Sequence, residues 1–350
     1  MSSQHAQHDP LSVLVYDIGG SHISAAVCEQ HTYVLRGLSR APLPAGSESP
    51  SQEGSRGAGH FSAASFGRLI HTLGEAASKA SNTPFASIAG AALAMPGPFD
   101  YEQGVSQMRH KLPALFGVDL KSALAIRFGW QPSQLRFVND AAAFLLGEVG
   151  AGAAKGYSRA IGITLGTGIG CAFAVNGRVV TDGPGVPPGG EIWNLPYNGA
   201  TVEDFVSTRF LRHNYQILTG MEAEVATIAD TAKGNHPCPE VLPSPPPEGA
   251  SPTTYLDPND PYAAHCRARQ AFQDFGRHLG LALNQHAAAF SPEVIVLGGG
   301  IARASHLFLP ATRKALVGFS PKIAISTLMD EAPLAGAGVH WFSTLDNRSN

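Results

Sequence analysis

Glycine-rich turns that follow apolar stretches constrain the fold of this 350-residue chain more than any other feature. The first turn, Gly19-Gly20-Ser21, joins an apolar segment at 11–17 to another at 23–28. Two later turns, at 166–170 and 298–300, also follow apolar segments. Because glycine has no Cβ, such turns let backbone N–H groups approach an anion closely. Turns of this kind at three widely spaced strand ends predict a nucleotide held between two domains.

Asp17 lies at the mouth of the first turn, next to the predicted phosphate-binding backbone. A carboxylate there can hold Mg²⁺, directly or through water, because magnesium prefers oxygen ligands and keeps several of its waters. The predicted nucleotide-binding residues are therefore Asp17, Gly19, Gly20, Ser21, Gly166, Thr167, Gly168, Gly298, Gly299 and Gly300.

Length and composition limit the classes of protein to consider. A chain of 350 residues with 44% apolar residues favours two domains with substantial cores. Mean hydropathy is close to zero and no apolar run is long enough to span a bilayer, which argues against a membrane protein. The N-terminal segment lacks the basic start and apolar core of a signal peptide. A net charge of −3 without a Lys/Arg block argues against nucleic acid as a partner. With neither a signal peptide nor a membrane span in the sequence, we expect a cytoplasmic protein.

The four cysteines are dispersed along the chain and form no CxxC pair. Disulfide frameworks and cysteine zinc sites have recognisable spacings, which Cys28, Cys171, Cys238 and Cys266 lack. No His/Asp/Glu trio has metal-ligand spacing either. The sequence therefore predicts reduced cysteines and no zinc site.

Hydrophobic periodicity predicts an α/β protein. We expect strands at 11–17, 23–28, 33–38, 87–94, 135–138, 159–165, 171–175 and 294–297. We expect helices at 61–79, 118–128, 141–150, 202–211, 223–231, 262–290 and 301–316.

Two lobes account for this order of elements. The predicted N-terminal α/β lobe spans 11–138, with a C-terminal helix at 333–346 as a candidate to complete it, and the larger C-terminal α/β lobe spans 139–332. Nine prolines within 236–261 predict an irregular surface insertion in the second lobe. Enrichment in Ser, Gly and Pro predicts a mobile loop at 40–60.

Asn139 and Asp140 end one apolar strand and open a helix, which leaves two interpretations of Asp140. The first is structural, because an aspartate at the start of a helix can serve as its N-cap. The second is catalytic, because a carboxylate beside a bound nucleotide can accept the proton of a substrate hydroxyl as its oxygen attacks phosphorus. In the catalytic case Asn139 can hydrogen-bond neighbouring hydroxyls and orient a sugar.

Residues 188–194 combine a glycine pair, Glu191 and an aromatic residue. A lone glutamate is usually a solvated surface residue, but flexible backbone beside an aromatic ring suits a loop that contacts sugar. Glu203 has weaker support, because Thr201 and Asp204 fit a capping box and Glu203 is then a first-turn helix residue.

Taken together, these motifs resemble those of the ROK family of sugar kinases and regulators, within the actin/Hsp70/hexokinase superfamily. The likeness runs over most of residues 11–342. Segments 17–21 and 165–170 resemble the two phosphate motifs, 296–301 resembles the adenosine motif, and 95–98 resembles the Pro-Gly turn. The resemblance implies a two-lobed actin-like ATPase (ribonuclease H-like) fold of the α/β class with an interdomain cleft.

The resemblance also implies roles for individual residues. Asp140 corresponds to the catalytic aspartate, which acts as the general base. The implied sugar-binding residues are Gly97, Asn139, Asp140, Glu191, Asn194 and Glu203. ATP and Mg²⁺ are the implied cofactors, a small-molecule sugar is the implied substrate, and a homodimer is the implied assembly.

Two departures from the family pattern concern the sugar site. The family commonly continues its Gly-Glu loop into Gly-His, whose His binds sugar and a structural zinc, whereas this chain reads Glu191-Ile-Trp-Asn194. The cysteine-rich zinc segment is replaced by 195–201, and Lys111 stands where an Asn is usual. We therefore expect no zinc and a sugar pocket that differs from that of the glucokinases.

The sequence thus predicts ATP-dependent phosphorylation of a sugar hydroxyl, with a hexose expected and Asp140 as the base. A non-catalytic sugar-binding sensor of the same fold is the alternative, which the altered loop at 191–194 keeps open. A third interpretation, an acetate kinase- or Hsp70-like ATPase, is disfavoured by the Asn-Asp pair and the Gly-Gly-Glu loop. The short polar stretch before the first strand favours an enzyme over a repressor with an N-terminal winged helix.

Overall fold

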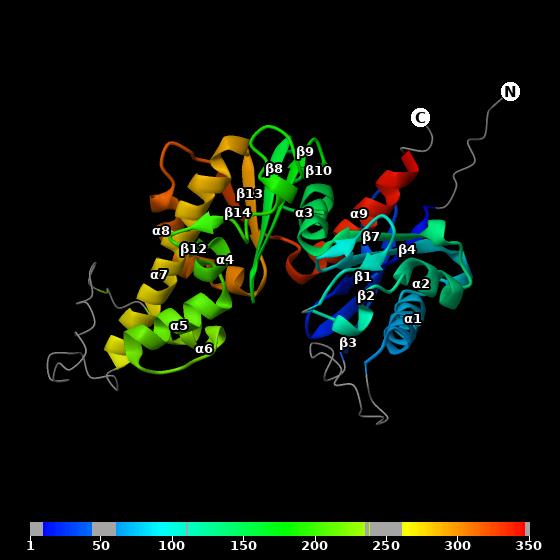
Figure 1. The fold of residues 1–350 in the computed structure, drawn as a ribbon, viewed down its shortest axis with the longest axis horizontal. Helices are drawn as coiled ribbons and strands as arrows, with labels where there is room; N and C mark the ends of the chain where they lie inside the picture. The colour runs from blue at the N-terminus through cyan, green and yellow to red at the C-terminus, as the bar shows by residue number, and fades with distance from the viewer. Residues whose placement is uncertain (1–9, 44–60, 110, 235–237, 239–260, 347–350) are drawn as a thin grey trace. The chain divides into compact units, whose positions relative to one another are not determined.

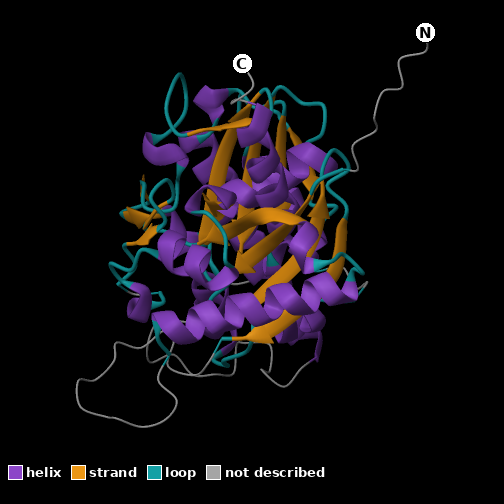
Figure 2. Cartoon of the chain, turned by 90° about the vertical axis from the view of Figure 1, so that its right-hand side faces the viewer, coloured by secondary structure: helices purple, strands orange, loops and turns teal. Residues whose placement is uncertain are grey.

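The computed structural model describes residues 10–43, 61–109, 111–234, 238 and 261–346, which form two compact units (Figure 1). The first unit contains the described residues up to Tyr157, the segment Gly177–Val179 and the described residues from Ser326 onward. The second contains Ser158–Asn176 and the described residues of Val180–Ile325. Strands gather into sheets with helices packed beside them (Figure 2).

A five-stranded sheet in the order β3-β2-β1-β4-β7 forms the centre of the first unit. β1, β2 and β3 are antiparallel neighbours, whereas β4 and β7 run parallel to β1. Their bounds are β1 (Ser12–Ile18), β2 (His22–Glu29), β3 (Leu35–Pro42), β4 (Ile88–Met95) and β7 (Leu135–Asn139). A separate hairpin is formed by β5 (Phe99–Asp100) and β6 (Val105–Ser106).

Helices pack on both faces of this sheet. On one face, α1 (Ala63–Ala80) and α2 (Leu120–Phe128) share a core with the even-numbered side chains of β1. On the other face lies α9 (Ala332–Asp346), whose Gly338 is so close to Cys28 and Val15 that an added Cβ would collide with the sulfur. α3 (Asp140–Ala151) packs against α9. The two helices approach so closely at Gly336 that a Cβ there would collide with the carbonyl oxygen of Ala143.

Local capping explains where the first helices begin and end. Ser62 and Ser65 form a capping box at the start of α1, so two otherwise unpaired backbone N–H groups are satisfied. The Asp119 carboxylate accepts the Ser122 N–H at the start of α2. Gly129 ends that helix with a φ of +70°, a conformation that favours glycine.

The second unit has its own five-stranded sheet, in the order β10-β9-β8-β13-β14. β8 and β9 form an antiparallel hairpin, whereas β13 runs parallel to both β8 and β14. The bounds are β8 (Arg159–Leu165), β9 (Ile169–Val175), β10 (Arg178–Val180), β13 (Val294–Gly298) and β14 (Lys322–Ile325). β11 (Pro196–Tyr197) and β12 (Ala200–Thr201) form a short hairpin.

The longest helix of the second unit, α7 (Pro261–His286), packs on α8 (Ser305–Ala315). Gly276 allows this approach, because a Cβ there would collide with the carbonyl oxygen of Phe308. The other α-helices among the described residues of this unit are α4 (Val202–Phe205), α5 (Thr208–Thr219) and α6 (Val225–Thr231).

Two differences from the sequence-based expectation concern where elements and units end. The helix expected at 202–211 is divided into α4 and α5, because Ser207 is extended and its side chain caps α5. The chain passes to the second unit after Tyr157, whereas the expected boundary followed residue 138. The cause is α3, which packs on α9 and so belongs to the first unit.

The prediction that all four cysteines are reduced is wrong for one pair, since Cys238 and Cys266 form a disulfide. Cys266 is buried in α7, and folding brings Cys238 beside it although the two are 28 positions apart in the sequence. Their spacing could not reveal this pairing, because the two residues meet only in the folded chain. Cys28 and Cys171 are free thiols and both are buried.

Some expectations concern parts of the chain that are only partly described. The loop expected at 40–60 and the insertion expected at 236–261 lie largely outside the described residues. Among the helices that are described, none is both long enough and apolar enough to cross a bilayer. Within the same described residues, no group of three or more His, Cys, Asp or Glu side chains is arranged to hold a metal ion.

Candidate active site

The carboxyl ends of β1, β4 and β7 lie at one edge of the first sheet, because these three strands are parallel (Figure 1). The register pairs Asp17 with Ala94, and Met95 with Asn139. Three predicted segments are therefore neighbours at this edge: the turn at 19–21, the turn at 96–98 that contains Gly97, and the Asn139-Asp140 pair.

Asp17 points to the face of the sheet that carries α9, since its neighbours Tyr16 and Ile18 belong to the core under α1. Burial and the nearby carboxylate of Asp140 raise the pKa of Asp17 to about 7. Asp330, in the short helix before α9, adds to this rise, whereas the Arg40 guanidinium opposes it. Arg40 offsets the neighbouring carboxylates only in part, so a bound cation would further favour the charged form of Asp17.

Arg40 is a residue that sequence reasoning missed. It pairs with Ser24 across β3 and β2, and Ser24 pairs with Asp17 across β2 and β1, so all three side chains share one row and one face. The Arg40 Nε donates a hydrogen bond to the Ser24 Oγ at 3.1 Å. The end of β3 lies in a stretch that the sequence assigned to a loop, so the signal for this row was absent.

Asn139, and not Asp140, is the N-cap of α3. The Asn139 Oδ1 accepts the Ala142 N–H at 3.0 Å, while its Nδ2 donates to the Tyr101 hydroxyl at 3.1 Å. That hydroxyl in turn donates to the Met95 carbonyl at 3.2 Å, which links the ends of β4 and β7. Asp140 is half-buried in the first turn of α3, where its Oδ1 accepts the N–H of Ala141 at 2.8 Å. The capping role is thus filled by its neighbour.

The two glycine turns of the second unit also lie at one sheet edge, because β8 and β13 are parallel and Gly298 pairs with Thr164. Gly299 has a φ of +82°, and a Cβ there would collide with the carbonyl oxygen of Leu165. Only glycine fits at this position. The second turn is also held from α5, since the backbone N–H and the hydroxyl of Thr208 both donate to the Gly166 carbonyl, at 2.9 and 2.8 Å.

The predicted sugar residues of the second unit lie on the loop at 191–194 and at the start of α4, and Glu203 contacts the β8–β9 turn. The Trp193 indole N–H donates to the Glu191 carboxylate at 2.7 Å. Burial raises the pKa of the Cys171 thiol in β9, and the charge of Glu191 raises it further. The Glu203 carboxylate accepts the Ile169 N–H at 3.3 Å. Asn194 is exposed on the same loop.

The capping box expected at the start of α4 is confirmed, and it leaves Glu203 out. The Asp204 carboxylate accepts the Thr201 N–H at 3.0 Å and its hydroxyl hydrogen at 2.6 Å. Glu203, which the sequence could not separate from an ordinary first-turn residue, instead points its carboxylate at the β8–β9 turn.

The donor set at the first sheet edge fits magnesium. Mg²⁺ is usually bound through one or two carboxylates together with substrate phosphates and waters, so it needs no dedicated protein cage. Asp17 supplies a carboxylate oxygen, and burial together with the nearby Asp140 carboxylate raises its pKa.

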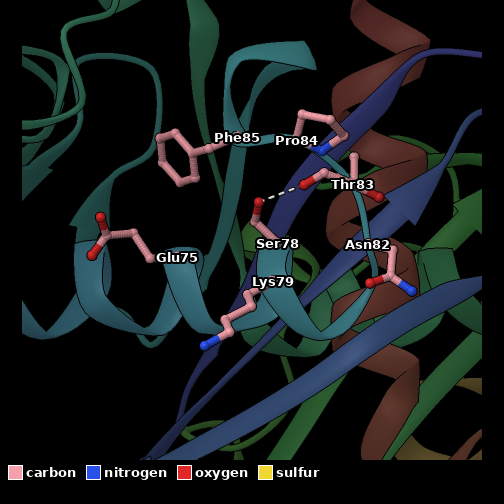
Figure 3. Close-up of a pocket in the computed structure, with 7 residues that line it drawn as sticks. All are labelled: Glu75, Ser78, Lys79, Asn82, Thr83, Pro84 and Phe85. Atoms are coloured by element: carbon pink, nitrogen blue, oxygen red, sulfur yellow. Dashed lines mark hydrogen bonds between the residues drawn. The ribbon is translucent and has the colours of Figure 1, made fainter.

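An open pocket of about 400 Å³ lies elsewhere in the first unit, at the C-terminal end of α1 (Figure 3). Its lining residues are Glu75, Ser78, Lys79, Asn82, Thr83, Pro84 and Phe85. The Ser78 hydroxyl donates to the Thr83 carbonyl at 2.6 Å. This hydrogen bond fixes the chain that follows α1 to the last turn of the helix. None of the predicted site residues lines this pocket.

The two α/β units, their mixed five-stranded sheets and the glycine turns at the sheet edges define a protein of the actin-like ATPase fold. A ROK hexokinase from Thermus thermophilus has this fold, with a TM-score of 0.68 at 22% identity over 96% of this chain and 100% of that one. A ROK family glucokinase from Streptomyces griseus, solved with glucose and AMPPNP, gives a TM-score of 0.65 at 19% identity over 93% and 97% of the two chains.

The sequence comparisons identify the family. The pattern of the ROK family matches residues 67–240. The glucokinase of Thermotoga maritima is 26% identical over 350 residues, which cover 93% of this chain and 96% of that protein. The chain belongs to the ROK family.

Proposed function

We propose that this protein is an ATP-dependent sugar kinase that transfers the γ-phosphoryl group of ATP to a hydroxyl of a hexose. The observation that carries the proposal is the position of Asp140, which lies in the first turn of α3 close enough to Asp17 to raise its pKa. The relatives support the substrate classes, since one is a glucokinase and another was crystallised with glucose and AMPPNP.

Asp140 is the proposed general base. Its carboxylate accepts the proton of the sugar hydroxyl while the oxygen attacks the γ-phosphorus. Asn139 is fixed by its bonds to Ala142 and Tyr101, so it can present a rigid hydrogen-bonding group to the sugar beside the base. Asp17 would hold, directly or through water, the magnesium ion that neutralises phosphate charge when the nucleotide is bound.

The nucleotide engages glycine turns of both units in this proposal. The residues of the 19–21 turn and of the 166–168 turn present backbone N–H groups to the phosphates, and the 298–300 turn supports the adenosine. Gly97, Glu191, Asn194 and Glu203 contact the sugar. Closure around the substrates excludes water, which otherwise competes with the sugar hydroxyl for the phosphoryl group.

A coupled assay of ADP release across a panel of hexoses and N-acetylhexosamines tests this function. The proposal predicts ADP formation that depends on both ATP–Mg²⁺ and one class of sugar. Sugar binding without any sugar-dependent ADP would favour the sensor, and ADP formation that no sugar stimulates would favour a simple ATPase. We also propose a homodimer, as the family resemblance implies. Sedimentation of the full chain measures the oligomeric state.

A further inference from the structure

We propose that Glu203 couples the two substrate sites of the second unit, as a positioning residue that holds the nucleotide turn at 166–168 to the sugar loop at 191–194. The inference rests on the proposed function, which assigns those two segments to ATP and to the sugar. Glu203 lies between them and contacts both. Binding of a substrate at either segment therefore changes the hydrogen bonds that hold the other segment in place.

The contact with the nucleotide turn is made by the carboxylate. Glu203 Oε2 accepts the Ile169 N–H at 3.3 Å and lies so close to Gly168 that an added Cβ would collide with it. Gly168 does not have the positive φ that calls for glycine. The backbone conformation at 168 therefore admits a side chain, but its Cβ would have to displace the Glu203 carboxylate.

The contact with the sugar loop is made by the backbone of the same residue. The Glu203 N–H donates to the Trp193 carbonyl at 3.0 Å, and the preceding Val202 N–H donates to the Leu195 carbonyl at 3.1 Å. Trp193 in turn holds the Glu191 carboxylate through its indole N–H. A continuous path of hydrogen bonds thus runs from Ile169 through Glu203 and Trp193 to Glu191.

The segment that contains Glu203 also grips the other end of the turn. Thr208, at the start of α5, donates two hydrogen bonds to the Gly166 carbonyl. Gly166 and Ile169 are therefore both fixed to residues 203–208. A sugar hydroxyl that draws the Glu203 carboxylate away from Ile169 must alter the turn, and by thermodynamic linkage a nucleotide on the turn alters sugar affinity equally.

Two alanine substitutions in one turn test the coupling, with KM measured for ATP and for the hexose that supports turnover. Gly168→Ala displaces the Glu203 carboxylate, so the KM for hexose should rise about tenfold, as for loss of one charged hydrogen bond. Gly166→Ala is the matched control, because a Cβ at 166 meets no protein atom within 4 Å. Its effect should fall on the KM for ATP and leave the KM for hexose within about twofold.

Variants of Glu203 separate positioning from a merely structural role. Glu203→Gln keeps an oxygen that can accept the Ile169 N–H, so the KM for ATP should stay near that of the wild type while the KM for hexose rises. Glu203→Ala loses the acceptor, and both constants should rise. Adding Gly168→Ala to Glu203→Ala should then raise the KM for hexose no further, because the two changes remove the same contact.

The outcomes distinguish failure of the coupling from failure of the function. If the wild type shows no sugar-dependent ADP, the proposed function fails and the coupling fails with it. If the wild type is active but Gly168→Ala and Gly166→Ala change the KM for hexose equally, the coupling alone is overturned. Additive effects of Gly168→Ala and Glu203→Ala would also overturn it. Midpoints of thermal unfolding confirm that each variant is folded.

Discussion

At the scale of single residues, Asp17 is held in a state that disfavours its charge. Its pKa is raised to about 7 by burial and by Asp140 and Asp330, with Arg40 opposing. The folded chain therefore binds the Asp17 proton more tightly than the unfolded chain does. Stability from this group is fully present below its ordinary pKa of 3.8 and is lost as the pH rises to about 7. Such strain is typical of a site prepared for a cation.

Asp17→Asn should therefore stabilise the protein at pH 8 and not at pH 4. Asparagine carries no charge to desolvate, and the gain at pH 8 should be on the order of 1–3 kcal/mol. Thermal unfolding of the two proteins at both pH values measures it. Equal midpoints at pH 8, or a loss of stability at both pH values, would mean that the folded protein does not disfavour the charged form of Asp17.

Arg40 supplies the positive charge that limits this effect. Arg40→Gln should reduce kcat/KM for ATP roughly tenfold, because a cationic side chain near Asp17 and the proposed phosphate site is lost. Arg40→Lys should recover part of the activity. Arg36→Gln is the control on the same strand, since Arg36 pairs with Glu29 at 3.0 Å and should have little effect. Equal losses in the Arg36 and Arg40 variants would argue against a role for Arg40 in the site.

At the scale of helices and strands, the position of Asp140 depends on how α3 packs. Gly336 of α9 lies directly against the backbone of α3, so a methyl group there must separate the helices. Gly336→Ala should lower the free energy of unfolding by about 1–3 kcal/mol, as overpacking does, and should also reduce kcat by displacing α3. Ser343→Ala, at an exposed position of the same helix, is the control. Wild-type stability and kcat in Gly336→Ala would contradict this view of the packing.

The sequence predicted the elements that have a clear hydrophobic pattern, either a continuous apolar run or an apolar stripe at helical spacing. β1, β2, β4 and β8 are long buried strands, and α1 has a clear apolar stripe, so each lies close to its expected position. The division between α4 and α5 was missed, because Ser207 interrupts a pattern that is apolar on both sides. The short hairpins and β14 were missed because so few residues carry no periodic signal.

The candidate site was predictable only where chemistry and local pattern coincide. Asp17, Asp140 and the glycine turns stand at the ends of apolar strands, so the sequence marks them directly. Arg40 and Asp330 reach the site through cross-strand pairing and through a helix from the far end of the chain. Glu203 shows its contact with Ile169 only once α4 is placed against the β8–β9 turn. No spacing rule contains this information.

At the scale of the whole molecule, the proposed chemistry requires both units. The first supplies Asp17, Asn139 and Asp140, and the second supplies the 166–168 turn with Glu203. In the proposal, neither unit by itself supplies all the groups that phosphoryl transfer to a sugar needs. The proposal therefore treats the two units as halves of one enzyme.

The rate of Asp140→Asn at saturating ATP and hexose tests the central claim most directly. Asparagine keeps the size of the side chain but cannot accept the proton, so kcat should fall about a thousandfold while calorimetric affinities for nucleotide and sugar stay near those of the wild type. Asp230→Asn, which alters an exposed aspartate paired with Lys233, should keep full activity. A kcat for Asp140→Asn close to that of the wild type would contradict the assignment of Asp140 as the base.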